Sequence, residues 1–231
     1  MDPSVASAEA RQRWRVVFRR EPMPVGDPAE SIARWAATLA DSGLPLAGPG
    51  TPGVRQAVAL GATLPGGWTG ERELLDIVLR TRLPIEAVRR AIAGTIPAGH
   101  ALVDLYDVWL GEPALAGRIR GADYRITLAA DGPPADRLAR ACAALLAADS
   151  LPRERAKGES RIGYDLRPLL DDVGVRDPGP PAIVSCRVRF DPSRGVGRPE
   201  EVVAVLGAAC ARPDLRPAAT VRERLLLVDD R

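Results

Sequence analysis

The stretch from residue 14 to residue 19 reads Trp-Arg-Val-Val-Phe-Arg, with large apolar residues at every second position. Successive side chains of a β-strand point to opposite faces of a sheet, so this alternation predicts a half-buried strand. One face of the strand is apolar and consists of Trp14, Val16 and Phe18. The opposite face is cationic and consists of Arg13, Arg15 and Arg19. The fold of this chain must therefore cover one side of a sheet and place arginines on the other.

Outward from this strand, the first half of the chain reads as β-α-β-β-α-β. The residues Asp27, Pro28 and Glu30 suit the cap, the first helical position and the capping-box position of a helix. Gly43 is a suitable residue to end that helix. The other expected elements of this half are strands at Val54–Leu60, Glu73–Leu79 and Ala101–Trp109, and a helix that begins at Pro84.

The same order of elements recurs in the second half. Tyr124–Leu128 alternates like the first strand, and Ile183–Phe190 alternates strongly. The remaining expected elements are a helix bearing Leu138, Cys142 and Leu145, a weaker strand at Arg161–Leu166, a helix from Pro199 and a strand at Val221–Val228. Two runs of six elements predict an internal duplication. We expect an α+β protein of tandem ferredoxin-like βαββαβ units, each an antiparallel sheet with two helices on one face.

The expected organisation has four parts: a flexible N-terminus at 1–12, a first half at 13–110, a linker at 111–121 and a second half at 122–231. At 231 residues the chain is long enough for two such domains. Its 46% hydrophobic and 27% charged residues are ordinary for a protein with a buried core. The sequence contains no 18-residue apolar run and no signal-peptide pattern, so we expect a cytoplasmic protein without membrane contact.

Charge and cysteine usage exclude several function classes. The net charge of +2 is small for a protein that coats nucleic acid, so only a local basic face is expected. The cysteines, at 142, 186 and 210, lack CxxC spacing and are expected to be buried, with no metal and no cofactor. His100, the sole histidine, could act as a general base, but the sequence pairs no nucleophile with it. No catalytic constellation is visible, which favours a protein that is not an enzyme.

Arginines on the predicted strands are the main candidate binding residues. The helices of a ferredoxin-like half cover one sheet face, so arginines on the other face would be exposed and could hold the phosphates of single-stranded RNA. Those polar faces carry no stacking aromatics, which RNA-recognition modules use. The alternative is that the arginines form solvated edges or salt bridges with Glu71, Glu73 and Asp104. The candidate RNA- or partner-binding residues are Arg13, Arg15, Arg19, Arg55, Arg125, Arg187 and Arg189.

Several short motifs run along nearly the whole chain: RVVFR at 15–19, SGLPL at 42–46, LPGG at 64–67 with Glu73, DVWLGEPALAG at 107–117, ADYRITL at 122–128, YDLRPL at 164–169 and RPEEVV at 198–203. Their order resembles that of a radical-SAM-linked bacterial family of unknown function. Members of that family occur as partners of, or C-terminal fusions to, radical-SAM proteins. The resemblance therefore implies an accessory role beside a radical-SAM protein. This chain lacks CxxxCxxC and cannot itself hold that enzyme's cluster.

Two segments of the resemblance imply site residues. The family's loop after the first helix resembles Gly-Phe-x-Pro-x-Pro followed by a small residue and an aromatic, whereas residues 50–57 here read GTPGVRQA. The candidates in this loop are Gly50, Pro52 and Gly53, and the missing aromatics predict an altered or lost site. The YDLRPL motif adds Asp165 and Arg167. The alternatives are a plain flexible connection at the loop and a local Asp–Arg pair that organises a turn.

Three functional hypotheses follow from the sequence. The first is a non-catalytic accessory protein that works with a radical-SAM protein and binds RNA through an arginine-bearing sheet face. The second is an RNA-processing endonuclease of the tandem ferredoxin-like type, for which Gly195-Val196-Gly197 offers a short glycine-rich loop and His100 a candidate catalytic residue. The third is a structural protein–protein interaction module, whose arginines pack against protein rather than against phosphate.

Overall fold

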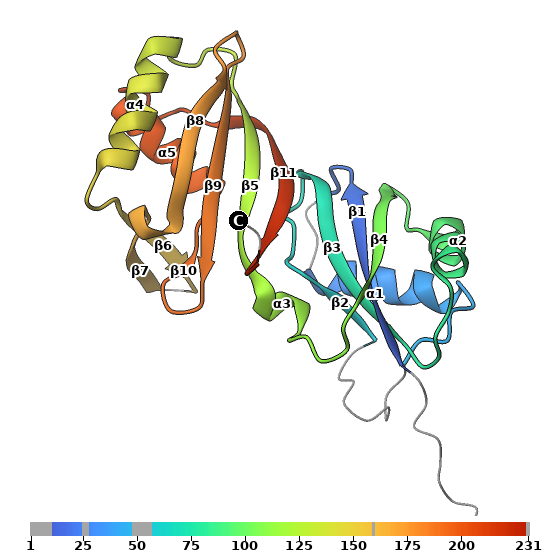
Figure 1. The fold of residues 1–231 in the computed structure, drawn as a ribbon. Helices are drawn as coiled ribbons and strands as arrows, with labels where there is room; N and C mark the ends of the chain where they lie inside the picture. Colours follow the sequence, from blue (N-terminus) through green and yellow to red (C-terminus); the bar gives the residue numbers. More distant parts are fainter. Residues whose placement is uncertain (1–10, 25–27, 48–56, 159, 230–231) are drawn as a thin grey trace, which may run out of the picture. The chain divides into compact units, whose positions relative to one another are not determined.

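A computed structural model shows a mixed α+β protein whose strands pair mostly antiparallel, which confirms the predicted class (Figure 1). The structure describes residues 11–24, 28–47, 57–158 and 160–229. The chain divides into two compact units. The first unit comprises residues up to 66 together with 72–118. The second comprises 67–71 together with 119 onward.

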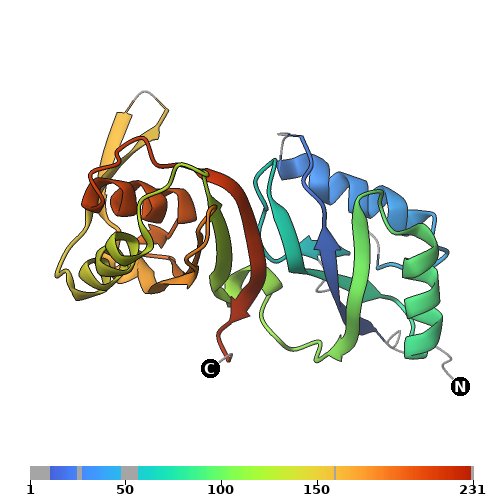
Figure 2. The ribbon, with the colours of Figure 1, turned by 90° about the horizontal axis from the view of Figure 1, so that it is seen from above.

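The first unit is built on a four-stranded sheet in the order β2-β3-β1-β4, with β1–β4 and β2–β3 antiparallel. Its strands are β1 (Gln12–Arg20), β2 (Val58–Leu60), β3 (Thr69–Leu79) and β4 (His100–Val108). Its helices are α1 (Pro28–Ala40), α2 (Ile85–Thr95) and the short α3 (Leu115–Arg118). Helices α1 and α2 lie on one side of this sheet (Figure 2).

The core of the first unit lies between the sheet and these two helices. It contains Trp14, Val16 and Phe18 of β1, as the alternation predicts. Helix α1 contributes Trp35, whose ring centroid lies 4.9 Å from that of Phe18. Burial of these large apolar side chains, at roughly 1.5–3 kcal/mol each, is what holds the helices against the sheet.

The second unit is built on a sheet in which β8, β9, β5 and β11 follow one another, all antiparallel, and β10 pairs with β9. Its strands are β5 (Ile119–Leu128), β6 (Pro152–Lys157), β7 (Ser160–Asp165), β8 (Leu170–Asp177), β9 (Ile183–Asp191), β10 (Gly195–Val196) and β11 (Pro217–Leu227). Its helices are α4 (Ala135–Ala147), the 3-10 turn η1 (Arg167–Leu169) and α5 (Pro199–Ala209). Helices α4 and α5 lie on one side of the sheet (Figure 2).

The first residues of β3 belong to this second unit. Thr69 and Gly70 pair in parallel with Val221 and Arg222 of β11.

The segment between β4 and β5, which was expected to be a linker, contains the helix α3. No helix in the described ranges is long and apolar enough to cross a membrane.

One predicted strand takes a different place. The sequence assigned Arg161–Leu166 to the main sheet, but β7 instead forms a separate two-stranded hairpin with β6. In the main sheet, β9 pairs with β8, a strand that was not predicted from the sequence. The reason is that β8 shifts register with β9 twice, between Leu170 and Asp172 and between Val175 and Asp177. These bulges break the alternation that identifies a half-buried strand.

A close backbone approach at Gly121 leads to a test of the sheet packing. A Cβ at Gly121 would lie 2.4 Å from the carbonyl oxygen of Val188 on β9, which is backbone and cannot rotate away. We expect Gly121→Ala to lower the free energy of unfolding by about 1–3 kcal/mol through overpacking. The matched control is Gly174→Ala on β8, where nothing lies within 4 Å of the added carbon. Urea unfolding followed by circular dichroism distinguishes them, and equal midpoints for the two variants would contradict the packing.

Candidate nucleic-acid interface

The polar face of the first unit is organised by one buried carboxylate, Asp76 on β3. The Nε atom of Arg15 lies 2.7 Å from Asp76 Oδ1, and Nη2 of Arg13 lies 2.6 Å from Oδ2. All three side chains are at most 9% exposed. Burial disfavours the charged guanidinium of Arg15, but the hydrogen bond and the charge of Asp76 outweigh it and raise its pKa.

The segment after β4 covers part of the same face. Arg13 donates hydrogen bonds to the carbonyl oxygens of Glu112 (2.9 Å) and Pro113 (3.0 Å). The expectation that Arg13 and Arg15 line an exposed face is therefore not met, because Asp76 and these carbonyls hold both guanidinium groups inside the unit. Arg19, on the same face of β1, is exposed.

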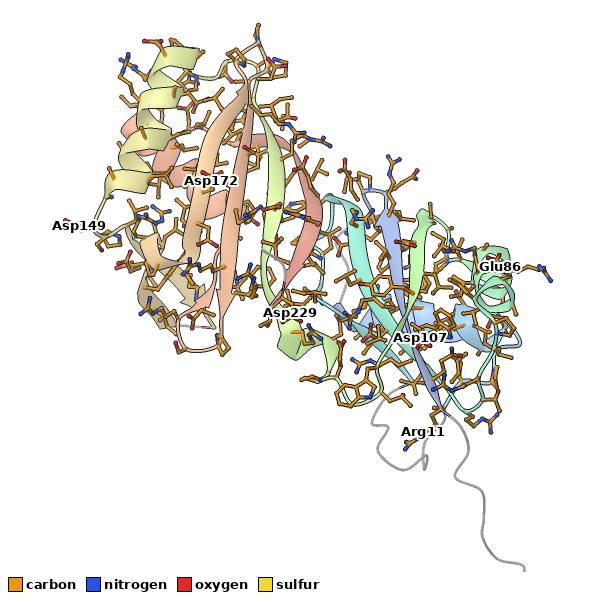
Figure 3. The ribbon with its side chains drawn as sticks, in the orientation of Figure 1. Arg11, Glu86, Asp107, Asp149, Asp172 and Asp229 are labelled. Atoms are coloured by element: carbon orange, nitrogen blue, oxygen red, sulfur yellow. The ribbon has the colours of Figure 1, made fainter. Side chains whose placement is uncertain are left out.

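The polar face of the second unit carries a different arrangement, in which arginines and carboxylates alternate across the strands and stay accessible. Asp123 of β5 accepts hydrogen bonds from Arg187 of β9 (2.6 Å) and from Arg224 of β11 (2.8 Å). Arg187 is also opposite Asp172 of β8, which is labelled in Figure 3. Burial opposes ionisation of Asp123, but the two guanidinium groups outweigh it and lower its pKa.

A second group of ion pairs extends this face. Arg125 of β5 lies 2.6 Å from Glu71 and 3.4 Å from Glu223. Glu223 also pairs with Arg176 of β8, and Arg189 of β9 pairs with Asp171. The guanidinium side chains are 31–59% exposed. We call this set the arginine face: Arg125, Arg176, Arg187, Arg189 and Arg224 with Glu71, Asp123, Asp171 and Glu223.

The arginine face brings together three of the predicted site residues: Arg125, Arg187 and Arg189. A salt bridge of the kind considered as the alternative, between a strand arginine and Glu71, is present at Arg125. Arg224 was missed because β11 shifts register between Arg222 and Arg224, so that the polar face there no longer follows every second residue. Arg176 was missed together with β8.

The hairpin β6–β7 and the turn at β10 form a second basic cluster, at one end of the second unit (Figure 1). The guanidinium carbon of Arg155 lies 5.1 Å from the ring centroid of Tyr164. Arg153 pairs with Glu201 at 2.7 Å. Two surface hollows, of about 770 and 620 Å³, are both lined by Tyr164. Asp149, labelled in Figure 3 after the end of α4, lines the larger one.

Asp165 and Arg167 of the YDLRPL motif do not form a direct ion pair; each binds backbone. Asp165 Oδ1 accepts hydrogen bonds from the backbone N–H groups of Leu151 (2.7 Å) and Arg167 (2.9 Å), which lower the pKa of its carboxyl. The Arg167 guanidinium donates to three carbonyl oxygens, those of Leu146 (2.9 Å), Ala148 (3.2 Å) and Leu170 (2.7 Å). The two residues therefore organise the end of α4 and the turn into β8, but each does so through backbone groups and not through the Asp–Arg pair that was considered as the alternative.

His100 packs against two aromatic rings of the first unit. Its ring centroid lies 5.5 Å from those of both Phe18 and Trp35, and its Nδ1 atom lies 3.0 Å from the carbonyl oxygen of Ala98. Burial lowers its pKa.

All three cysteines are buried, as expected, and burial raises the pKa of Cys142 to about 11. Within the described residues, no cluster of three or more His, Cys, Asp or Glu side chains could hold a metal ion.

The remaining predicted site residues, Gly50, Pro52, Gly53 and Arg55, lie outside the described residues.

The fold and these surfaces define an α+β protein with two arginine-bearing sheets. Residues 54–199 match the family described as "Uncharacterized protein conserved in bacteria (DUF2344)", and the chain belongs to that family. The description mentions no radical-SAM protein, so the predicted association stays a prediction. No curated protein matches the sequence.

Several solved structures resemble the chain at 12–13% identity, which shows the fold alone. A chain of a Cbf5-Nop10-Gar1 complex aligns with 92% of this chain and 48% of its own length, at a TM-score of 0.52. A chain of an H/ACA RNP bound to a substrate RNA aligns with 92% of this chain and 47% of its own, at 0.49. Thermus thermophilus Cas6 aligns with 92% of this chain and all of its own length, at only 0.23. The chain thus spans about half the length of the first two matches.

Proposed function

We propose that this protein is a non-catalytic accessory protein that binds single-stranded RNA through the arginine face of its second unit. We further propose that its halves, at 13–110 and 122–231 with a linker at 111–121, are diverged copies of one ferredoxin-like βαββαβ plan. The element orders support the duplication: β1-α1-β2-β3-α2-β4 parallels β5-α4-β8-β9-α5-β11. The strand orders β2-β3-β1-β4 and β8-β9-β5-β11 also correspond. The hairpin β6–β7 would then be an insertion in the second copy.

The observation that carries the RNA proposal is the accessibility of five guanidinium groups on one sheet face. Arg187, Arg189 and Arg224 are 39%, 59% and 46% exposed although each has a carboxylate partner. A surface ion pair contributes only up to about 1 kcal/mol, so a phosphate oxygen can replace the carboxylate at little cost. Arginine is suited to that exchange because its planar fork binds phosphate with two hydrogen bonds.

The composition of the face predicts what kind of binding to expect. It offers guanidinium groups but no aromatic platform among the residues defined above, so contacts to the phosphate backbone should dominate over stacking on bases. The carboxylates between the arginines nearly neutralise the face. We therefore expect moderate affinity, little sequence preference and a dependence on salt.

A salt titration tests this proposal. We expect the affinity for a fluorescent single-stranded RNA to fall linearly with salt on logarithmic axes, measured by fluorescence anisotropy. The double variant Arg187→Gln/Arg189→Gln should weaken binding and make the slope shallower by about 0.7 for every phosphate that it no longer neutralises. The matched control is Arg140→Gln, which removes a 71% exposed arginine from the outer side of α4. A slope near zero for the wild type, or an unchanged slope for the double variant, would rule out phosphate binding on this face.

The association with a radical-SAM protein belongs to this proposal through the sequence resemblance alone. Co-purification with a CxxxCxxC protein from the native host is the expected result, and it should persist when the arginine face is substituted, because that face is proposed to bind RNA. Loss of the partner on that substitution, together with no RNA binding by the wild type, would favour the third hypothesis, a protein–protein interaction module. The endonuclease hypothesis gains no support from His100, because its ring packs against Phe18 and Trp35.

A further inference from the structure

We propose that the basic cluster around Tyr164, at the end of the second unit, is a binding site for a phosphate group. Its cationic residues are Arg155, Arg194 and Arg198, with Tyr164 as a hydrogen-bond donor. This site is separate from the arginine face and does not depend on RNA binding there.

The local fold brings these residues together from three segments. Arg155 comes from β6 and Tyr164 from β7, while Arg194 and Arg198 flank β10 and lead into α5. The hairpin and the β10 turn approach each other closely: Gly195 has φ +107°, and a Cβ there would lie 3.2 Å from Nη2 of Arg155. Glycine at this position therefore leaves the space that the Arg155 guanidinium occupies.

The guanidinium groups of this cluster differ from those of the arginine face because no described carboxylate lies within ion-pair distance of them, although the charges of Asp191 and Glu200 are close enough to interact with Arg194 and Arg198. Within the part of the chain that the structure describes, Arg155, Arg194 and Arg198 form no ion pair, whereas the neighbouring Arg153 is paired with Glu201. Arg155 is instead held over the Tyr164 ring by a cation–π contact. Several guanidinium groups that are held near one another, none of them in an ion pair, attract a multivalent anion more strongly than a single guanidinium group does.

The hydroxyl group of Tyr164 supplies a second, independent observation that points to a ligand. Its Oη atom is shielded from solvent and has no hydrogen-bond partner among the described residues. A buried hydroxyl in that condition is unusual in folded proteins and calls for an acceptor. Burial, followed by the charge of Glu201, raises the pKa of the phenol, so at neutral pH it remains a donor.

The shape of the site suits a phosphate group at the end of a larger molecule. The larger hollow, lined by Tyr164 and Arg194, has about 770 Å³, and the smaller one, lined by Tyr164 and Arg153, about 620 Å³. Arg155 lies over the Tyr164 ring, and the charges of Arg155 and Arg198 both act on its phenol, so a phosphate bound beside Tyr164 would interact with both guanidinium groups. Of the carboxylates nearby, Asp165 is engaged by backbone N–H groups and Glu201 by Arg153. Asp149 in the larger hollow and Glu154 in the smaller one would oppose the anion.

Isothermal titration with inorganic phosphate tests the site directly. We expect the wild type to bind, the double variant Arg155→Gln/Arg198→Gln to bind about tenfold or more weakly, and Arg140→Gln to bind like the wild type. Tyr164→Phe should weaken phosphate binding while leaving the melting temperature without phosphate unchanged or higher, because it removes an unpaired buried hydroxyl. If Tyr164 had only a structural role, the Tyr164→Phe variant would have a lower melting temperature without phosphate than the wild type.

Short single-stranded oligouridylates with and without a 5′-phosphate identify the source of the phosphate. A preference for the 5′-phosphorylated strand that disappears in the double variant indicates a terminal phosphate; equal loss of affinity for both strands indicates an internal phosphodiester. The arginine-face variant Arg187→Gln/Arg189→Gln should still bind inorganic phosphate, which separates this proposal from the previous one. No phosphate binding by the wild type, or wild-type affinity in the double variant, would overturn it. If the double variant does not fold, an unchanged phosphate affinity of the Tyr164→Phe variant would overturn the proposal.

Discussion

Replacement of Asp76 by asparagine should lower the free energy of unfolding of the first unit by about 3–5 kcal/mol. Asparagine keeps the size of the side chain but removes the charge that Arg13 and Arg15 share. Arg15 is 2% exposed, so its guanidinium cannot regain water without opening the unit. The loss of stability is large because breaking a buried pair leaves an uncompensated charge, whatever the pair itself contributes.

Tryptophan fluorescence during urea unfolding is the suitable measurement, because Trp14 and Trp35 are both buried in the core of the first unit. The control is Asp136→Asn, which removes the carboxylate of an exposed pair with Arg140 and should change stability by less than about 0.5 kcal/mol. The triple variant Asp76→Asn/Arg13→Met/Arg15→Met should recover much of the stability, since it removes both buried charges. A single Asp76→Asn variant as stable as the control would show that the guanidinium groups reach solvent.

Replacement of Arg167 by methionine should destabilise the second unit by about 2–3 kcal/mol. Methionine preserves much of the apolar stem, so the effect reports the guanidinium. That group donates to the carbonyls of Leu146, Ala148 and Leu170, two of which lie at the C-terminal end of α4. The last carbonyls of a helix have no partner within the helix, so an external donor contributes more there than on a helix side.

Thermal unfolding followed by circular dichroism measures this effect, with Arg140→Met on the exposed side of α4 as the matched control. Because Arg167 also lines the larger hollow, phosphate titration of the folded variant separates two roles. We expect reduced stability with phosphate affinity within a few-fold of wild type, since the guanidinium nitrogens are already engaged by carbonyl oxygens. Unchanged stability with abolished phosphate binding would instead make Arg167 a ligand-binding residue.

The alternation of β1, β5 and β9 could be predicted from sequence because each strand has one apolar face that alternates along its own residues. Strands β5 and β9 also pair with each other without a register shift, and β1 shifts against β4 at one point. Where a bulge interrupts the pairing, prediction failed: β8 was missed, and so was the contribution of Arg224 from β11. A shift of one residue exchanges the two faces, and nothing in a single sequence marks its position.

Arginine residues on the same kind of strand have different environments, which the sequence could not distinguish. Arg15 and Arg187 both alternate with apolar residues, yet Arg15 is 2% exposed and Arg187 39%. The difference comes from their partners, since Asp76 and the segment at 112–113 enclose the arginines of the first unit, and Asp123 lies on an accessible face. Those partners are 61 to 100 residues away along the chain, and no periodic signal connects them to the arginines.

The sequence by itself determined the α+β class, the β-α-β-β-α-β order of the first half and the apolar face of its strands, because these depend on local periodicity and turn residues. The tertiary structure decided which arginines are enclosed, which stay accessible, and that Arg155, Arg194 and Arg198 gather around Tyr164. The physical reason is that a guanidinium takes its environment from carboxylates, carbonyls and rings that only folding brings within a few ångströms of it.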